Sequence, residues 1–162
     1  MTSLNISLIH KLILFLGTVI ISISATASDL SQNQRLADRG NADSQLNLGL
    51  MYYNGEGVRQ DYAKAFQWTQ KSANQGNDRA QYNLGSMYYQ GHGVRQDYAK
   101  AFQWMQKSAY QGNAAAQSNL GGMYAKGQGV RQNRTQAKEW FGKACDGGNQ
   151  VGCDNYRRLN QR

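Results

Sequence analysis

Apolar and small residues recur at helical spacing through most of the chain, and the pattern repeats every 36 residues. Gly40, Gly76, Gly112 and Gly148 mark this period, and an asparagine follows each of them. In three successive copies the next slots hold a glutamine, a Leu-Gly pair, a methionine and a tyrosine, the first copy beginning at Gln45. A fixed period of this length is typical of stacked supersecondary units that cannot bury their apolar faces alone.

Each unit is predicted to contain two short helices. The stretch from Asn41 to Tyr53 carries its apolar residues at helical spacing, and Gly55-Glu56-Gly57 stops it because glycine gives a tight turn its backbone freedom. Asp61, Asp97 and Asn133 stand where second helices should begin, and each can cap an orphan amide group. Proline is absent, so no kink is expected. The sequence therefore predicts an all-α fold.

Residues that differ between the copies predict a binding surface. In the first helix of each unit they fall at steps of three, four and four residues, which places them on one helical stripe. The unchanging Gln45, Leu48 and Gly49 lie on the opposite side, where we expect them to hold neighbouring helices together. The variable stripe is expected to be exposed and to bind a partner through its tyrosines and a bordering asparagine row, the alternative being drift on a solvent face. The predicted partner-binding residues are Asp43, Leu46, Asn47, Leu50, Tyr53, Arg79, Tyr82, Asn83, Ser86, Tyr89 and Asn119.

The repeated residues resemble the Sel-1-like repeat, a relative of the tetratricopeptide repeat. The segments Ala73-Asn74-Gln75-Gly76-Asn77, Leu84-Gly85-Ser86-Met87-Tyr88 and Asp97-Tyr98-Ala99-Lys100-Ala101 match that family's pattern nearly position for position. The resemblance implies a right-handed α/α solenoid whose first helices line a concave surface, and a scaffold for protein interactions with no common reaction. The expected organisation is a partial helix or cap at 28–36, repeats at 37–72, 73–108 and 109–144, and a capping helix at 145–162.

The first 27 residues have the features of a signal peptide. Lys11 precedes an almost wholly apolar run from Leu12 to Ile23, and Ala25-Thr26-Ala27 places small residues where a signal peptidase cleaves. The run is shorter than the roughly 20 residues that span a bilayer, so no membrane span is expected after cleavage, the alternative being an uncleaved anchor. The chain is therefore expected to be exported, to the periplasm or outside the cell, and to be a monomer.

The two cysteines are expected to form a disulfide. Cys145 and Cys153 occupy the slots that Ala73 and Gln81 hold in the second unit, which places one at the end of a second helix and the other in the following first helix. Such a pair can close a helical hairpin, and export favours its oxidation. The bridge would secure the terminal helix, from Asn149 to Asn160, as a cap. The same segment resembles the secreted, disulfide-bearing branch of the repeat family.

Charge adds a second class of partner. The net charge is +8, and removal of the leader takes away one charge, that of Lys11. About five of the remaining charges lie between Lys126 and Arg162. A basic end favours anionic envelope components such as acidic proteins, wall polymers or lipid headgroups, and a solvated basic face is the alternative. Nucleic acid is not expected as a partner of an exported chain.

The sequence shows no catalytic constellation. The cysteine-rich branch includes proteins linked to penicillin binding and weak β-lactam hydrolysis, yet the Ser-X-X-Lys and Lys-Thr-Gly motifs of serine enzymes are missing. His92 stands on a turn where the matching slots hold Glu56 and Gln128, so we expect it to be solvated and not to ligate a metal or join a triad. We predict no enzyme, metal or cofactor. A binder of cell-wall glycan, muropeptide or β-lactam-like ligands is the second interpretation.

Overall fold

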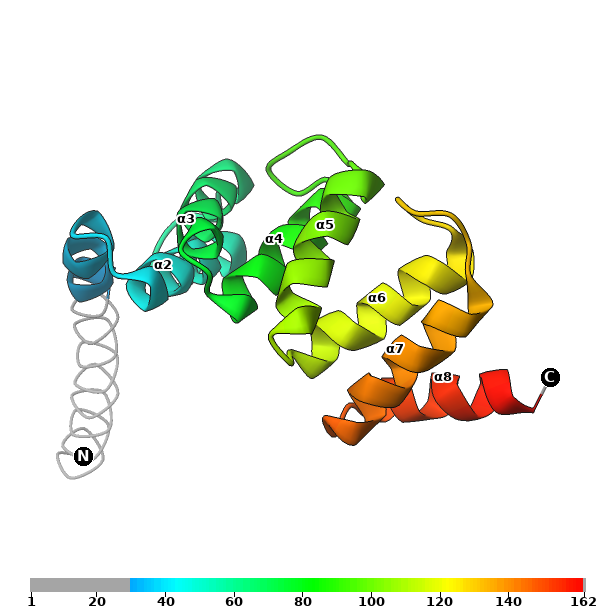
Figure 1. Cartoon of the computed structure of the whole chain (residues 1–162). Coiled ribbons are helices and arrows are strands. Elements are labelled where there is room, and N and C mark those ends of the chain that lie inside the picture. The colour runs from blue at the N-terminus through cyan, green and yellow to red at the C-terminus, as the bar shows by residue number, and fades with distance from the viewer. Residues whose placement is uncertain (1–29, 162) are drawn as a thin grey trace, which may run out of the picture.

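The computed structural model describes residues 30–161. Within that range short turns join helices that stack into a right-handed α/α solenoid (Figure 1). The predicted signal peptide, residues 1–27, lies outside the described residues. No helix within residues 30–161 has the length and apolar character needed to cross a membrane. Residues 30–38 are helical, and the helices that follow are α2 (Ala42–Asn54), α3 (Tyr62–Asn74), α4 (Asp78–Gln90), α5 (Tyr98–Tyr110), α6 (Ala114–Lys126), α7 (Arg134–Asp146) and α8 (Gln150–Asn160).

Asparagine caps open the first helix of each unit. Asn41 has an extended backbone and accepts a hydrogen bond from the Ser44 amide at 2.8 Å, and Asn77 accepts one from the Ala80 amide at 2.9 Å. The first helices therefore begin one residue later than predicted, and α8 likewise begins after its cap, Asn149. The asparagine that recurs every 36 residues is explained by this role, since an N-cap satisfies an amide that the helix itself leaves unpaired.

The predicted caps of the second helices are confirmed. The side chains of Asp61, Asp97 and Asn133 each accept a hydrogen bond from the amide three residues further along. The bond from the Lys100 amide lowers the pKa of the Asp97 carboxyl, because it stabilises the charged form.

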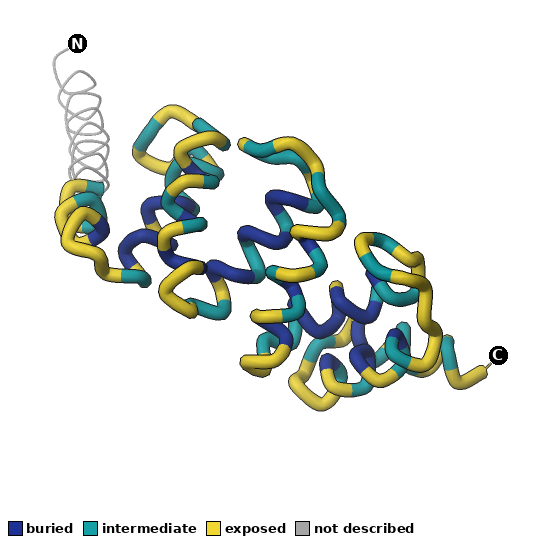
Figure 2. The backbone as a smooth tube through the Cα atoms, turned by 45° about the horizontal axis from the view of Figure 1, so that its top comes forward, coloured by how far each residue is buried: buried dark blue, intermediate teal, exposed yellow. Residues whose placement is uncertain are grey.

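The core lies between the two helices of each unit and continues into the next unit. Leu48, Leu84 and Leu120 occupy one slot of the repeat, and none of them has measurable exposure. Gly85 allows close helix packing, because an added Cβ would lie 3.0 Å from the Met105 Cγ. Figure 2 shows buried positions running along the middle of the solenoid, whereas the turns are largely exposed.

Buried glutamines connect consecutive units, as the unchanging slot predicted. The side-chain nitrogen of Gln81 donates to the Ala73 carbonyl in α3 at 3.3 Å, and Gln111, at the end of α5, donates to the Gln81 side-chain oxygen at 2.8 Å. Gln75 makes the equivalent bond to Gln45 at 2.7 Å. A buried amide is costly unless it is hydrogen-bonded, and these bonds offset that cost.

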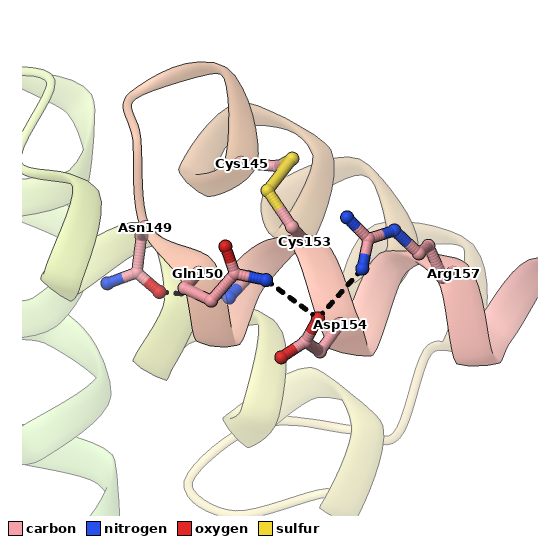
Figure 3. The surroundings of a disulfide bond; sticks show 7 residues. Cys145, Asn149, Gln150, Cys153, Asp154 and Arg157 are labelled. Atoms are coloured by element: carbon pink, nitrogen blue, oxygen red, sulfur yellow. Dashed lines mark hydrogen bonds and ion pairs between the residues drawn. A yellow bond between two sulfur atoms is a disulfide. The ribbon is translucent and has the colours of Figure 1, made fainter.

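A disulfide joins α7 to α8 (Figure 3) and confirms the predicted pairing. Cys145 at the end of α7 is bonded to Cys153 in α8, with their Cα atoms 4.4 Å apart. The two helices also approach closely at Gly152, where an added Cβ would lie 2.7 Å from the Ala144 Cβ. The terminal helix is thereby held against the last full unit.

Candidate functional site

A groove lies along the side of the solenoid that the first helices form. Its volume is about 670 Å³, and α4, α6 and α8 supply most of its lining, with α5 and α7 contributing one residue each. The lining residues are Tyr82, Ser86, Tyr89, Gln90, Met105, Ser118, Asn119, Gly122, Met123, Ala125, Lys126, Gln128, Phe141, Val151, Asn155, Arg158 and Leu159. We call this surface the α4–α6–α8 groove.

Gly122 provides open space in the groove. Its repeat slot holds Leu50 in α2 and Ser86 in α4, so the third unit lacks a side chain where the other two have one. A Cβ built on Gly122 would meet nothing within 4 Å. The adjacent Gly121 differs, because its Cβ would lie 2.8 Å from the Phe141 ring. One glycine is thus required for packing, and its neighbour leaves room for a ligand.

Four of the predicted partner-binding residues line this groove: Tyr82, Ser86, Tyr89 and Asn119. The others lie elsewhere on the first helices. Asp43 is exposed at the start of α2 and accepts a hydrogen bond from the Asn77 side chain at 2.9 Å. Arg79 and Asn47 are exposed, and Asn83 is half-buried.

The expectation that the whole variable stripe is exposed is wrong at one slot. Leu46 has only 2% of its surface exposed and belongs to a cluster with Ala73 and Ala80 at the start of the next unit. Leu50 packs against the same cluster, and Ser118, in the Leu46 slot of the third unit, is buried too. The physical reason is that this slot faces the following unit. Variation there reflects local packing between units.

Two of the predicted partner-binding tyrosines, which border the variable stripe, connect one unit to the next. The Tyr53 hydroxyl lies 2.8 Å from His92 Nδ1, and the Tyr89 hydroxyl donates to Gln128 Oε1 at 3.0 Å. His92 is half-buried and stacks on Tyr62 with ring centroids 4.7 Å apart, so the expectation of a solvated turn residue is wrong. Burial raises the pKa of the Tyr53 hydroxyl, and nearby Tyr62 raises it further, so the hydroxyl stays protonated at neutral pH.

Exchanging His92 tests this connection between units. We expect His92→Gln to keep most of the stability, because Gln128 fills the same slot of the third unit and bonds to Tyr89 of the second unit. His92→Ala should lower the free energy of unfolding by about 1 kcal/mol, the typical net value of one hydrogen bond. Urea unfolding followed by circular dichroism measures both variants. Equal losses in both would contradict the hydrogen-bond role and assign the contribution to ring stacking alone.

The contribution of α8 to the groove was not predicted from the sequence. Val151, Asn155, Arg158 and Leu159 line it, and Val151 is 61% exposed. One further step of the 36-residue period would have found them, because Asn155 continues the asparagine row from Asn119. The last unit is incomplete, because it has no second helix within the described residues, and this made the continuation of the repeat less evident.

The charges that line the groove are all positive. Lys126 and Arg158 lie in the last turns of α6 and α8, and no carboxylate is among the lining residues. The ion pairs found within residues 30–161 lie elsewhere and join Lys64 with Asp61, Lys100 with Asp97, and Arg157 with Asp154. In the same part of the chain no three His, Cys, Asp or Glu side chains cluster as metal ligands. The groove therefore offers aromatic, amide and cationic groups, which suit recognition of a ligand.

Known proteins resemble both the sequence and this architecture. A family model of the Sel1 repeat matches residues 42–77, 78–113 and 114–149. The crystal structure of a Sel1 repeat protein from Oxalobacter formigenes superposes with a TM-score of 0.74 at 38% identity, covering 80% of this chain and 98% of that chain.

Two further structures support the same assignment. The protective antigen c5321 of uropathogenic Escherichia coli, which displays an SLR fold, gives a TM-score of 0.65 at 34% identity over 78% of this chain and 35% of its own. Helicobacter pylori cysteine rich protein B gives 0.64 at 25% identity, over 78% of this chain and 93% of its own. Among curated proteins none matches. The chain belongs to the Sel1 repeat family, whose fold is generally a non-enzymatic scaffold and whose members commonly bind other proteins.

Proposed function

We propose that this chain is an exported scaffold of the cell envelope that binds another protein in the α4–α6–α8 groove, without catalysing a reaction. The observation that carries the proposal is the open space at Gly122, bounded by residues that vary between otherwise similar units. Tyr82 and Tyr89 offer large, stiff contact surfaces there. Asn119 is exposed, and its amide can both donate to and accept from a peptide backbone.

Export is supported from both ends of the chain. The charged and apolar pattern before Ala27 has the form of a signal peptide. The Cys145–Cys153 disulfide fits an oxidising compartment, since disulfides are rare where thiols are kept reduced. We place the chain in the periplasm or outside the cell and expect it to act as a monomer.

A crosslinking pull-down from an envelope fraction tests the proposal when it compares two substitutions of one residue. Gly122→Leu and Gly122→Ala both raise helix propensity by up to about 1 kcal/mol, but only leucine fills the groove. We expect a protein that wild type and Gly122→Ala capture and that Gly122→Leu loses, with all three chains folded by circular dichroism. These glycine variants test the groove more directly than alanine at Tyr53 or Tyr89, because the hydroxyls of those two tyrosines form hydrogen bonds between units.

The same pull-down distinguishes protein binding from the second interpretation, in which the chain binds wall glycan or muropeptide. Exposed aromatic surface and the positive charges of Lys126 and Arg158 favour it. If wall fragments co-purify and no protein does, the glycan interpretation replaces the protein-binding one. If a protein is captured equally by Gly122→Leu, the partner binds outside the groove and the proposed site is wrong.

A further inference from the structure

We propose that the α4–α6–α8 groove recognises an acidic, extended protein segment, with a large apolar side chain seated over Gly122 and a neighbouring carboxylate held by Lys126 and Arg158. This inference rests on the proposed function and adds the chemistry of the partner. Three features of the groove carry it: its unfilled apolar floor, its uncompensated positive charge and its asparagine row.

The floor beside Gly122 is apolar and open. Met123 and Phe141 reach it from α6 and α7 and are otherwise well packed, with 2% and 5% of their surfaces exposed. Val151 on α8 leaves 61% of its surface in solvent. An apolar side chain entering here would cover Val151 and fill space that the leucine of the first unit, Leu50, occupies in its own slot. The geometry fits a large aliphatic or aromatic group.

The positive charges of Lys126 and Arg158 line the same groove. Arg158 donates to the Asn155 side chain at 2.7 Å, and this bond orients the guanidinium without neutralising it. The remaining donors of the planar guanidinium match the two oxygens of a carboxylate. Lys126 adds a second cation, and neither residue is in any of the ion pairs of the described chain.

Stabilisation of helix ends explains these cations less well. A cation in the last turn of a helix does interact favourably with the helix dipole. However, the slot of Lys126 holds Asn54 in α2 and Gln90 in α4, and those helices end at the same turn without a charge. The slot of Arg158 holds Leu50, Ser86 and Gly122 in the full units. Both cations are therefore particular to the groove end of the solenoid.

The asparagine row favours a peptide over a simple anion. Asn119 and Asn155 lie one period apart on adjacent first helices and both line the groove. A side-chain amide pairs with the donor and acceptor that each peptide unit presents, so a row of them suits an extended backbone. The apolar floor, the asparagine row and the two cations together fit a segment in which an acidic residue stands close to a large apolar one.

A random linear peptide library, displayed on phage, is the probe that tests this inference with the purified chain. We expect enriched peptides to combine Asp or Glu with a large apolar residue and to bind more weakly as salt is raised. Synthetic copies, measured by fluorescence anisotropy, should bind Lys126→Glu/Arg158→Glu at least about tenfold more weakly, because each reversal replaces attraction with repulsion. The control Arg59→Glu/Arg95→Glu makes the same change in net charge at exposed turn residues outside the groove lining and should alter affinity less than about twofold.

The outcomes separate this inference from the proposed function. Peptides that lose binding in Gly122→Leu but bind the Lys126→Glu/Arg158→Glu variant unchanged would overturn the acidic segment and leave a protein-binding groove. Peptides that bind Gly122→Leu unchanged would overturn both. Failure to enrich any peptide, with acidic muropeptides binding in their place, would also overturn both and assign the cations to a wall ligand.

Discussion

Gly93→Ala should uncouple the first unit from the second and lower the free energy of unfolding by more than about 4 kcal/mol, a loss far above that of an ordinary substitution. Gly93 has a φ of +71°, and its added Cβ would overlap the carbonyl group of Tyr62 at the start of α3. The obstacle is backbone, so no rotamer change can relieve it. The turn would have to lift from α3 and take His92 off Tyr62. Gly129 repeats the arrangement against Tyr98, and Gly129→Ala should behave alike.

Gly112→Ala is the matched control for this prediction. Gly112 also has a positive φ, +93°, but its added Cβ would meet nothing within 4 Å. It should therefore show only the cost of a left-handed backbone, about 1–2 kcal/mol. Urea unfolding measures the difference, and hydrogen exchange in α2 and α3 should rise in Gly93→Ala alone, since a solenoid can open at a single interface between units. Equal losses in the two variants would show that the contact with Tyr62 contributes nothing.

Loss of the disulfide is the second large effect we expect. Replacing Cys145 and Cys153 together with alanine should lower the free energy of unfolding by about 2–3 kcal/mol in the chain-entropy model for a short loop. The loss should concentrate in α8, where Gly152 is the only buried residue. Hydrogen exchange should show α8 unprotected while α4 and α5 keep their protection.

The same variant should also impair binding, because α8 forms one wall of the groove. Reduction of the wild-type chain by dithiothreitol should reproduce both effects, and reduction of the alanine variant should change nothing further. If α8 keeps its protection after reduction, its packing on α7 is sufficient and the disulfide has no role as a cap.

The repeat made much of the fold predictable from the sequence. Gln45, Leu48 and Gly49 keep their residue types through three copies at helical spacing on one side of the first helix, which predicts their burial, and all three are buried. The caps at Asp61 and Asp97 and the pairing of the cysteines depend on local sequence and spacing, and they too were predicted.

Features that depend on contacts between units were not predictable in this way. Helical periodicity assigns Leu46 to the variable stripe, but only the placement of the following unit buries it. His92 differs in type from Glu56 and Gln128, so the sequence alone predicts a solvated turn residue, whereas its slot provides a hydrogen bond to a tyrosine in the preceding unit. The groove likewise combines Gly122 of α6 with Val151 of α8, and the sequence of either helix alone does not indicate that both residues line one cavity.

Site-specific photocrosslinking tests most directly the central claim that the groove binds a protein partner. A benzoylphenylalanine is introduced at Asn119, exposed in the groove, or at Gln103, exposed on α5 and outside the groove lining, in cells that express the full chain. We predict a crosslink to a protein from position 119 and none from position 103. Crosslinks from position 103 alone, or equally from both positions, would contradict the account.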